Sequence, residues 1–432
     1  MQKSITRREA LAAGGVLATG VWLGTSASAK PPGPNERLNI ACIGVGGRGS
    51  ANVNGVSGEN IVALCDVDEN RARQTFQRHR NARRFTDFRR MYDQMERQID
   101  AVVISTPDHT HFHPSYMALQ RRKHVYLEKP MAHNVWQVRQ LTDFARRQGV
   151  ATQLGVQRHT IPNMARVVEL IRAGTIGDVT EVHSWIGSGR GMRPDPEYPA
   201  VPNTLNWDLW LGPARQERYS PSYAPYNWRF WWDYGTGETG NWGCHILDIP
   251  FWALNLRYPT RVSASNANPH ARKTPTSMTT HLEFPAVGDR RALTLHWYQG
   301  TPPILRQRGL DGRGANNVFI GTRGILVCGF SSRRLYPVEQ FRDHEAPEQT
   351  IPRSPGFYRE WLNACRGGQA ATCNFNYSGP MTETVLLANA AFRAGGEAFN
   401  WDGERMRATG NDAVTPFLRE PFRDGWAIET NN

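Results

Sequence analysis

Short apolar runs alternate with longer polar stretches of helical character between Leu38 and Gly155. Apolar runs of this kind are typical of strands buried in a parallel sheet. The runs cover Leu38–Gly44, Ile61–Val67, Ala101–Thr106, Val125–Leu127 and Ala151–Gly155. Helices are predicted between them, for example over Asn70–Arg80 and Val135–Gln148. The alternation predicts a doubly wound α/β fold with a parallel sheet.

Beyond Gln157 the rhythm of the chain changes. A predicted helix over Asn163–Ala173 and a strand near Thr180–Ile186 precede a region rich in Trp and Pro that extends to Tyr234. Strands in which apolar and polar residues alternate are then predicted over Arg261–Ala267, Met278–Phe284, Ala292–Tyr298 and Val318–Cys328. A helix is predicted over Pro380–Ala394. Strands in direct succession favour a mostly antiparallel sheet. We therefore predict a doubly wound domain over residues 37–157 and a C-terminal α+β domain with an open sheet over residues 158–432.

The first 29 residues have the three parts of an export signal. Arg7 and Arg8 form a twin-arginine motif, an apolar stretch runs from Leu11 to Leu23, and Ala27-Ser28-Ala29 fits a cleavage site. The apolar stretch is short and rich in Gly and Ala, which disfavours a spanning helix. Residues 30–36 then form a Pro-rich linker. The sequence predicts twin-arginine export to the periplasm and no stable membrane insertion after cleavage; the alternative is an uncleaved anchor.

Composition limits the remaining classes of function. Hydrophobic residues make up 39% of the chain and charged residues 21%, which is an ordinary globular balance. The net charge of +12 comes from scattered Lys and Arg residues, and no nucleic-acid-reading motif accompanies them. We therefore expect no nucleic-acid partner. Cys365 and Cys373 could pair in an oxidising compartment, and the sequence leaves that open.

A glycine-rich loop follows the first predicted strand and precedes a helix. Its glycines at 44, 46 and 49 have the spacing G-x-G-x-x-G, with Gly47 and Arg48 between them. This context is typical of dinucleotide binding, where the backbone and the helix N-terminus meet the pyrophosphate. Asp66 ends the next strand, in the position that accepts hydrogen bonds from the ribose hydroxyls. Its charge would repel a 2′-phosphate, so we predict a Rossmann domain that binds NAD rather than NADP.

The next two strands end in further polar sequence. The loop from Thr106 and Pro107 contains His109, His111 and His113, and the strand after it ends in Glu128-Lys129-Pro130. Loops at the carboxyl ends of parallel strands lie beside the ligand, so we predict that the first loop packs against the cofactor. A zinc site would need a distant partner cluster, which is not evident, so no metal is expected.

These motifs resemble the glucose-fructose oxidoreductase, inositol dehydrogenase and rhizopine-catabolism (Gfo/Idh/MocA) family. The resemblance also includes Gly243-Cys244-His245-Ile246-Leu247-Asp248 and extends over the chain after the signal. It implies an NAD(P)-dependent oxidoreductase whose C-terminal sheet often forms contacts in a homo-oligomer, a dimer or tetramer. It also implies that Glu128 and Lys129 lie near the nicotinamide and that Lys129 and His245 are catalytic. Alcohol oxidation releases a hydride and a proton, and a neutral Lys or His can accept the proton.

One residue departs from the family pattern. Asn241 stands where many members have an Asp, and an amide can position a hydroxyl but cannot take its proton. Asp248 follows His245 by one helical turn and is a candidate for orienting it. The region from Trp207 to Trp252 is dense in aromatic residues, most of which we assign to packing. Trp231 is the candidate for stacking on a sugar ring.

Three functions remain open. The first is an exported oxidoreductase that acts on a sugar, sugar acid or cyclitol and holds NAD tightly, because the periplasm offers no obvious pool of free NAD. The second is a glycoside-cleaving enzyme that oxidises the sugar transiently, eliminates the aglycone and reduces the ring again. The third is a non-catalytic binding protein that keeps a Rossmann fold, because a fold alone does not determine a function.

Overall fold

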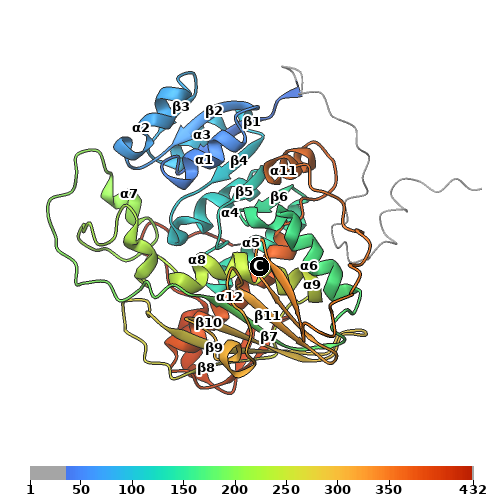
Figure 1. Ribbon diagram of the computed structural model, residues 1–432. Helices are drawn as coiled ribbons and strands as arrows, with labels where there is room; N and C mark the ends of the chain where they lie inside the picture. Colours follow the sequence, from blue (N-terminus) through green and yellow to red (C-terminus); the bar gives the residue numbers. More distant parts are fainter. Residues whose placement is uncertain (1–35, 431–432) are drawn as a thin grey trace, which may run out of the picture.

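The computed structural model describes residues 36–430. The predicted export signal and residues 30–35 of the linker lie outside the described residues. Figure 1 shows the fold with the N-terminal half above and the C-terminal sheet below.

The N-terminal half is built on a six-stranded parallel sheet, which confirms the doubly wound prediction. The strands lie in the order β3-β2-β1-β4-β5-β6, the Rossmann order. Their bounds are β1 (Asn39–Ile43), β2 (Asn60–Cys65), β3 (Arg83–Phe85), β4 (Ala101–Ile104), β5 (His124–Leu127) and β6 (Thr152–Leu154). The strand β3 was not predicted, because its three residues form no apolar run.

Helices connect these strands, and several of them begin at a polar side-chain cap. Asp68 accepts hydrogen bonds from two backbone N–H groups at the start of α2, and Asn134 accepts one at the start of α5. Gly149 ends α5 with a φ of 65°, a left-handed conformation that suits glycine. The helices are α1 (Arg48–Gly55), α2 (Glu69–Arg78), α3 (Phe88–Met95), α4 (Phe112–Gln120) and α5 (Val135–Gln148).

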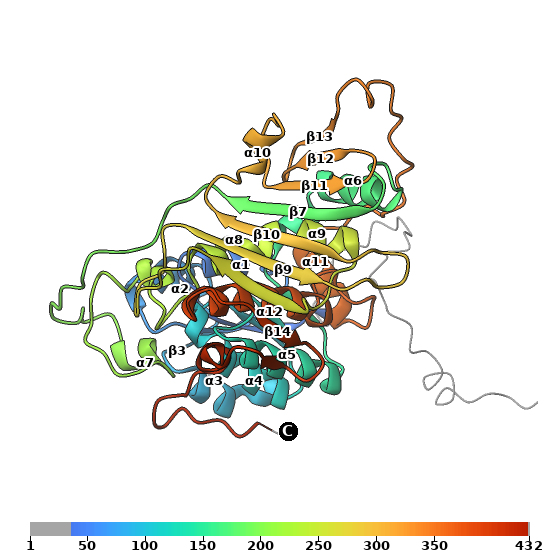
Figure 2. The same ribbon diagram turned by 90° about the horizontal axis from the view of Figure 1, so that it is seen from below.

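A nine-stranded sheet forms the C-terminal half, with the order β13-β12-β11-β7-β10-β9-β8-β14-β15. All its pairs are antiparallel except β7 with β10, which agrees with the predicted mostly antiparallel sheet. Figure 2 shows the strands from β13 to β9 side by side. The strands are β7 (Val179–Ile186), β8 (Arg261–Ser265), β9 (Met278–Phe284), β10 (Leu293–Gln299), β11 (Asn317–Gly321), β12 (Ile325–Cys328), β13 (Arg333–Tyr336), β14 (Phe399–Asp402) and β15 (Arg407–Thr409).

One predicted strand is two strands in the structure. The run Val318–Cys328 is a hairpin of β11 and β12, because the chain turns at Gly324 and the two halves pair with each other.

The helices of this half lie largely between the two sheets. The helix α12 contacts α5 of the first domain as well as α8, β8 and β9 of the second. It begins earlier than predicted because the Asn374 side chain caps it, and Pro380 lies inside it. The helices are α6 (Pro162–Arg172), α7 (Trp207–Leu211), α8 (Gly237–Ile246), α9 (Asp248–Leu254), α10 (Ile304–Gln307), α11 (Phe357–Cys365), α12 (Phe375–Arg393) and α13 (Thr415–Leu418).

An ion pair joins the two halves in the interior. Arg139 of α5 donates two hydrogen bonds of 2.7 Å to the carboxylate of Glu383 on α12, which is fully buried. Arg139 also donates to the carbonyl oxygen of Gly403. Both charges are therefore satisfied by hydrogen bonds at the domain boundary.

Two further points concern the possible cysteine pair and the membrane. The thiols of Cys365 and Cys373 are free, so the structure forms no disulfide between them. In residues 36–430, every helix is too short or too polar to cross a bilayer.

Candidate active site

A cavity of about 690 Å³ lies at the carboxyl ends of the parallel strands. The loops after β1, β2, β4 and β5 form one wall, and residues of α8 and of the aromatic segment before it form the other. The lining includes Gly44, Gly46, Gly47, Arg48, Asp66, Thr106, Pro107, Glu128, Lys129, Arg158, Trp228, Arg229, Asn241 and His245. The cavity therefore brings most of the predicted site residues together.

The glycine loop turns sharply between β1 and α1. Gly44 has a φ of 74°, and a Cβ there would lie 2.8 Å from the backbone of Ser105. A Cβ on Gly49 would lie 1.7 Å from the carbonyl oxygen of Gly44. Gly49 itself does not line the cavity; it allows α1 to pack directly against the loop. Only glycine fits both positions.

Asp66 fixes this loop from the next strand. Its carboxylate accepts hydrogen bonds from the backbone N–H groups of Val45 and Gly46, at 2.8 and 3.1 Å, and from that of Asp68 at 3.0 Å. Burial raises the pKa of Asp66, and these N–H donors oppose the shift. The carboxylate therefore lines the cavity beside the loop, where a ribose would lie if a dinucleotide bound in the usual way.

The loop after β4 divides into lining and supporting residues. Thr106 and Pro107 line the cavity, and the buried Thr106 hydroxyl has no hydrogen-bond partner among the described residues. His109 and His111 do not line it, which corrects the prediction that they contact the cofactor. Their rings bond to backbone carbonyl groups, His109 to Trp210 and Tyr234 and His111 to Thr106 and Pro130. Both imidazoles thus hold neighbouring backbone in place.

Glu128 connects the loop after β5 with α1. Its carboxylate accepts hydrogen bonds from Arg48 at 3.1 Å, Asn52 at 3.0 Å and Gln157 at 2.7 Å. Arg48, which belongs to the predicted dinucleotide-binding loop, pairs with Glu128 at the cavity wall.

Lys129 is held by the residue that departs from the family pattern. Its ammonium group donates to the backbone oxygen of Asn241 at 2.8 Å and to the side-chain oxygen at 3.0 Å. The Asn241 amide donates in turn to Glu238 at 3.3 Å, and Glu238 is paired with Arg190. Burial lowers the pKa of Lys129, and the nearby charge of Arg229 lowers it further, while Glu128 and Asp108 oppose the shift.

His245 reaches the same cavity from α8. It is 9% exposed, and its Nδ1 is buried without a hydrogen-bond partner among the described residues. Burial lowers its pKa well below the usual value, and the charges of Lys129, Arg158 and Arg48 lower it further. The ring is therefore neutral at pH 7, and a neutral imidazole can accept a proton.

Asp248 lies behind the cavity wall and does not orient His245. Its carboxylate bonds to His159 Nδ1 at 2.9 Å and to the Tyr377 hydroxyl at 2.6 Å, and the side chain is fully buried. The predicted role in substrate positioning is therefore wrong, because α8 ends at Ile246 and a separate helix, α9, begins at Asp248. His159, Asp248 and Cys373 form a close group outside the lining of the cavity.

The aromatic contribution to the cavity also differs from the prediction. Trp231 is 1% exposed, donates to the carbonyl oxygen of Ser222 and belongs to a buried aromatic cluster, so it cannot stack on a ligand. Tyr226 and Trp228 line the cavity instead. The density of aromatic residues correctly indicated that this segment contributes to the site. No periodicity in the sequence shows which of its aromatic side chains are buried and which line the cavity. Sequence reasoning also missed Gln157, Arg158 and Asp108, which line the cavity.

The cavity fits a dinucleotide on three observations. Glycines occupy loop positions where a Cβ would clash, the Asp66 carboxylate lies beside the loop, and Thr106, whose hydroxyl has no partner among the described residues, lines the same cavity. The residues that would hold NAD are the loop glycines, Asp66, Thr106 and Pro107. Lys129, Asn241 and His245 would then lie at the reactive end.

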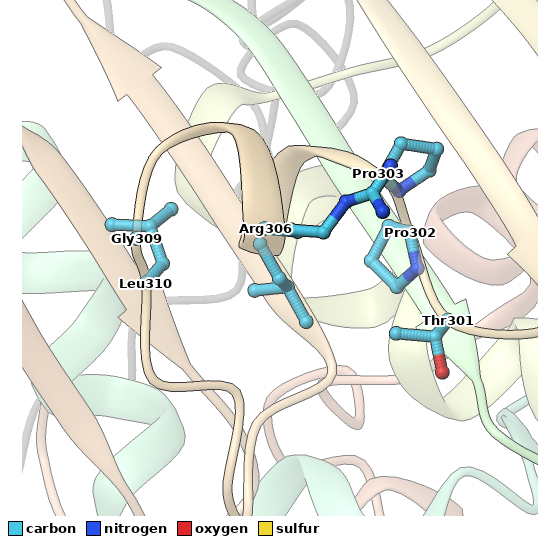
Figure 3. Close-up of a pocket in the computed structure, with 7 residues that line it drawn as sticks. Thr301, Pro302, Pro303, Arg306, Gly309 and Leu310 are labelled. Atoms are coloured by element: carbon cyan, nitrogen blue, oxygen red, sulfur yellow. The ribbon is translucent and has the colours of Figure 1, made fainter.

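A second cavity of about 680 Å³ has different chemistry. It is lined only by residues of the segment 301–310, and Figure 3 shows Arg306 extending beside Pro303 there. Arg306 is its single ionisable lining residue, so this cavity contains no acid–base pair.

Comparison with known proteins adds family evidence. Residues 38–156 match the model "Oxidoreductase family, NAD-binding Rossmann fold", and residues 182–428, more than half of the chain, match "Oxidoreductase family, C-terminal alpha/beta domain". The chain is 29% identical over 159 residues to inositol 2-dehydrogenase of Rubrobacter xylanophilus, which covers 35% of the chain and 45% of that protein. It is 30% identical over 167 residues to a glycosyl hydrolase family 109 protein of Solibacter usitatus, which covers 34% of the chain and 36% of that protein. Less than half of the length of each of these two relatives is thus matched.

Solved structures share the fold over a greater length. The WlbA dehydrogenase of Bordetella pertussis, in complex with NADH and UDP-GlcNAcA, superposes with a TM-score of 0.59 at 16% identity. The match covers 85% of this chain and 99% of that one, and at this identity the likeness concerns the fold. With both family models matched in order along the chain, the protein belongs to the Gfo/Idh/MocA oxidoreductase family.

Proposed function

We propose that the protein is an NAD-dependent oxidoreductase that transfers hydride between the cofactor and a hydroxyl group of a sugar, sugar acid or cyclitol. One observation carries the proposal: Lys129 from the Rossmann half and His245 from the C-terminal half line the same cavity as the glycine loop. The similarity to inositol 2-dehydrogenase supports a polyhydroxylated substrate.

NAD, when bound, supplies the acceptor for the hydride. The residues of this chain handle the hydroxyl and its proton. Lys129 has a lowered pKa, so a larger fraction of it is the neutral amine that can accept the proton. Asn241 fixes the Lys129 amine through two oxygens, and the neutral His245 ring offers a second acceptor. In sugar reduction the same groups return the proton.

The test measures NADH absorbance with purified protein, NAD and a panel of sugars, sugar acids and cyclitols. Lys129→Ala and His245→Ala should each lower kcat by about 100- to 10,000-fold, the usual contribution of an acid–base group. NAD affinity, measured by titration calorimetry, should remain. Lys123→Ala is the matched control, because Lys123 precedes the opposite end of β5 and lies outside the cavity lining. If no compound in the panel reduces NAD, whether the NAD is added or already bound to the protein, this function is rejected.

A second candidate is glycoside cleavage by transient oxidation, elimination and re-reduction of the sugar. The similarity to the glycosyl hydrolase family 109 protein favours it. The same cavity residues would serve, since the first and last steps are again proton and hydride transfers. Release of an aglycone from aryl glycosides without net NADH would identify this reaction, whereas an accumulating oxidised sugar would identify simple oxidation.

Export and assembly complete the proposal. Because twin-arginine export moves folded proteins, the cofactor would be loaded before export and held through each turnover. Fusion of residues 1–36 to a reporter, with Arg7 and Arg8 both changed to Lys as the control, tests the signal. Mass spectrometry of denatured native protein would detect retained NAD. We also propose a homo-oligomer, a dimer or tetramer, which light scattering during size-exclusion chromatography would measure.

A further inference from the structure

Two arginines beside the catalytic pair lack an acid partner. Arg158 and Arg229 both line the cavity, and neither forms an ion pair with any residue in the described range 36–430. Two other arginines near the cavity are neutralised, since Arg48 pairs with Glu128 and Arg190 with Glu238. The reactive end of the cavity therefore has two guanidinium groups that are in no ion pair, with the Asp108 carboxylate as a nearby negative charge.

Each of the two guanidinium groups lies over two aromatic rings. The Cζ of Arg158 lies 4.4 Å from the ring centroid of Phe330 and 5.2 Å from that of Trp242. The Cζ of Arg229 lies 4.1 Å from the centroid of Trp228 and 4.6 Å from that of Tyr226. Stacking fixes the plane of an arginine while its N–H groups remain at the edge, free to bind an anion.

Few of these N–H groups are used within the protein. Arg229 donates one hydrogen bond, to the backbone oxygen of Tyr226 at 3.1 Å. A guanidinium has five N–H donors, so most of those on Arg229 remain for a ligand. Asp108, a cavity residue whose charge acts on Arg229, is engaged by the Thr236 hydroxyl at 2.6 Å.

Each of the two arginines lies near one member of the catalytic pair. Arg158 shares the Trp242 ring with His245, whose centroid lies 6.1 Å from that of Trp242. Arg229 acts electrostatically on Lys129, whose pKa it lowers. A third arginine of the cavity, Arg71, lies at the end formed by the glycine loop. Its side chain is next to Gly46 and Gly47. Arg71 is thus placed for the cofactor, and Arg158 and Arg229 for the substrate.

We propose that the substrate has an oxyanion group, a carboxylate or a phosphate ester on the sugar, that Arg158 and Arg229 bind next to the oxidised hydroxyl. This inference rests on the proposed function and narrows its substrate class to acidic sugars. Burying positive charge without a partner is costly, and an anionic ligand removes that cost. Charge-assisted hydrogen bonds to a fixed guanidinium also orient the ring, so that one hydroxyl faces Lys129.

The experiment compares matched sugars that differ only in the acidic group: glucose with glucuronate and glucose 6-phosphate, and galactose with galacturonate. We expect kcat/KM for an acidic member to exceed that for its neutral partner by at least about tenfold, as expected of charge-assisted hydrogen bonds. Arg158→Met and Arg229→Met should reduce this ratio by about tenfold each. Arg313→Met, at an exposed arginine outside the cavity, is the control and should leave the ratio unchanged.

Binding gives a readout that does not need turnover. Trp228 and Trp242 contact the two arginines, so glucuronate or glucose 6-phosphate should change the tryptophan fluorescence of the protein. The affinity should fall in both Met variants and recover in part with Arg→Lys, which keeps the charge.

The outcomes separate the two proposals. If neutral sugars reduce NAD as well as acidic ones and the Met variants leave the ratio unchanged, the inference is overturned while the oxidoreductase function stands. If no sugar reduces NAD but acidic sugars bind in an arginine-dependent manner, the inference stands and the function fails. Preference for the 6-phosphate over glucuronate would support the inference and identify the oxyanion as a phosphate.

Discussion

The Lys129 ammonium group is hydrogen-bonded by two oxygens of a single residue, Asn241, at 2.8 and 3.0 Å. Both oxygens are neutral, so the residue orients the amine and stabilises its positive charge less than a carboxylate would. The substitution of an amide for the acid found in many relatives therefore has a clear electrostatic meaning. It keeps the pKa of Lys129 lower than a carboxylate at the same place would.

Asn241→Asp should raise the pKa of Lys129, because a carboxylate at hydrogen-bond distance favours the charged ammonium. Sugar oxidation needs the neutral amine, so the acid limb of the kcat/KM–pH profile should move to higher pH, by about one to three units. Asn81→Asp, at an exposed position outside the cavity, is the control. An unchanged limb, or one moved to lower pH, would show that Lys129 is not the group that titrates.

Gly49→Ala should weaken NAD binding by at least about tenfold, or 1.4 kcal/mol. The new Cβ would lie 1.7 Å from the Gly44 carbonyl oxygen, so α1 must move away from the loop. Gly58→Ala is the matched control, because its Cβ would meet nothing within 4 Å. The affinities come from NADH fluorescence titration. Equal affinities for the two variants would contradict the assigned packing role.

Asp66→Asn should shift the preference of the protein from NAD toward NADP. Removing the carboxylate removes its repulsion of a 2′-phosphate, and the ratio of the two affinities should fall by about tenfold. Asp93→Asn, an exposed acid on α3, serves as the control. Titration calorimetry with both nucleotides measures the ratio. A preference that stays the same in Asp66→Asn would remove Asp66 from the ribose site.

His113 should make the protein sensitive to acid. Burial lowers its pKa to about 4, so the unfolded chain binds a proton below pH 6.5 that the folded chain does not. Stability from this group is complete above pH 6.5 and falls as the pH decreases toward 4. At pH 5 the loss is about 2 kcal/mol relative to pH 7.

The measurement is the free energy of unfolding in urea at pH 7 and pH 5. Between pH 7 and pH 5, the free energy of unfolding of His113→Gln should fall by about 2 kcal/mol less than that of the wild type. This difference should hold whatever the stability of the variant at pH 7. His344→Gln, at an exposed histidine, should show the wild-type difference. If His113→Gln shows it too, then His113 is not the source of the acid sensitivity.

Local sequence patterns were sufficient for most of the fold. The helix predicted over Val135–Gln148 has those bounds in the structure, because Asn134 and Gly149 cap it. The predicted strand Met278–Phe284 also agrees, since its apolar and polar positions alternate. The element β3 escaped prediction because it is short and charged, and pairing with β2 rather than its own sequence defines it.

The candidate site was predictable where chain order determines position. Residues at the ends of parallel strands, such as Asp66 and Lys129, lie in the cavity because all these ends meet at one edge. Long-range packing decided the rest. His109 resembles a cofactor ligand in sequence, yet the carbonyl groups that hold it come from Trp210 and Tyr234. Trp228 and Trp231 belong to the same buried cluster, and no local pattern shows that Trp228 lines the cavity while Trp231 does not.

The buried pair of Arg139 and Glu383 also affects how such a protein can be recombined. In a chimaera of two related proteins joined near residue 157, Arg139 would come from one protein. The residue at position 383, which lies 244 positions further along the chain, would come from the other. A parent lacking the acid would leave a buried, unpaired guanidinium, which commonly costs about 3–5 kcal/mol. The two halves are thus not exchangeable modules. A working chimaera has to inherit α5 and α12 together, so that the buried guanidinium keeps its carboxylate partner.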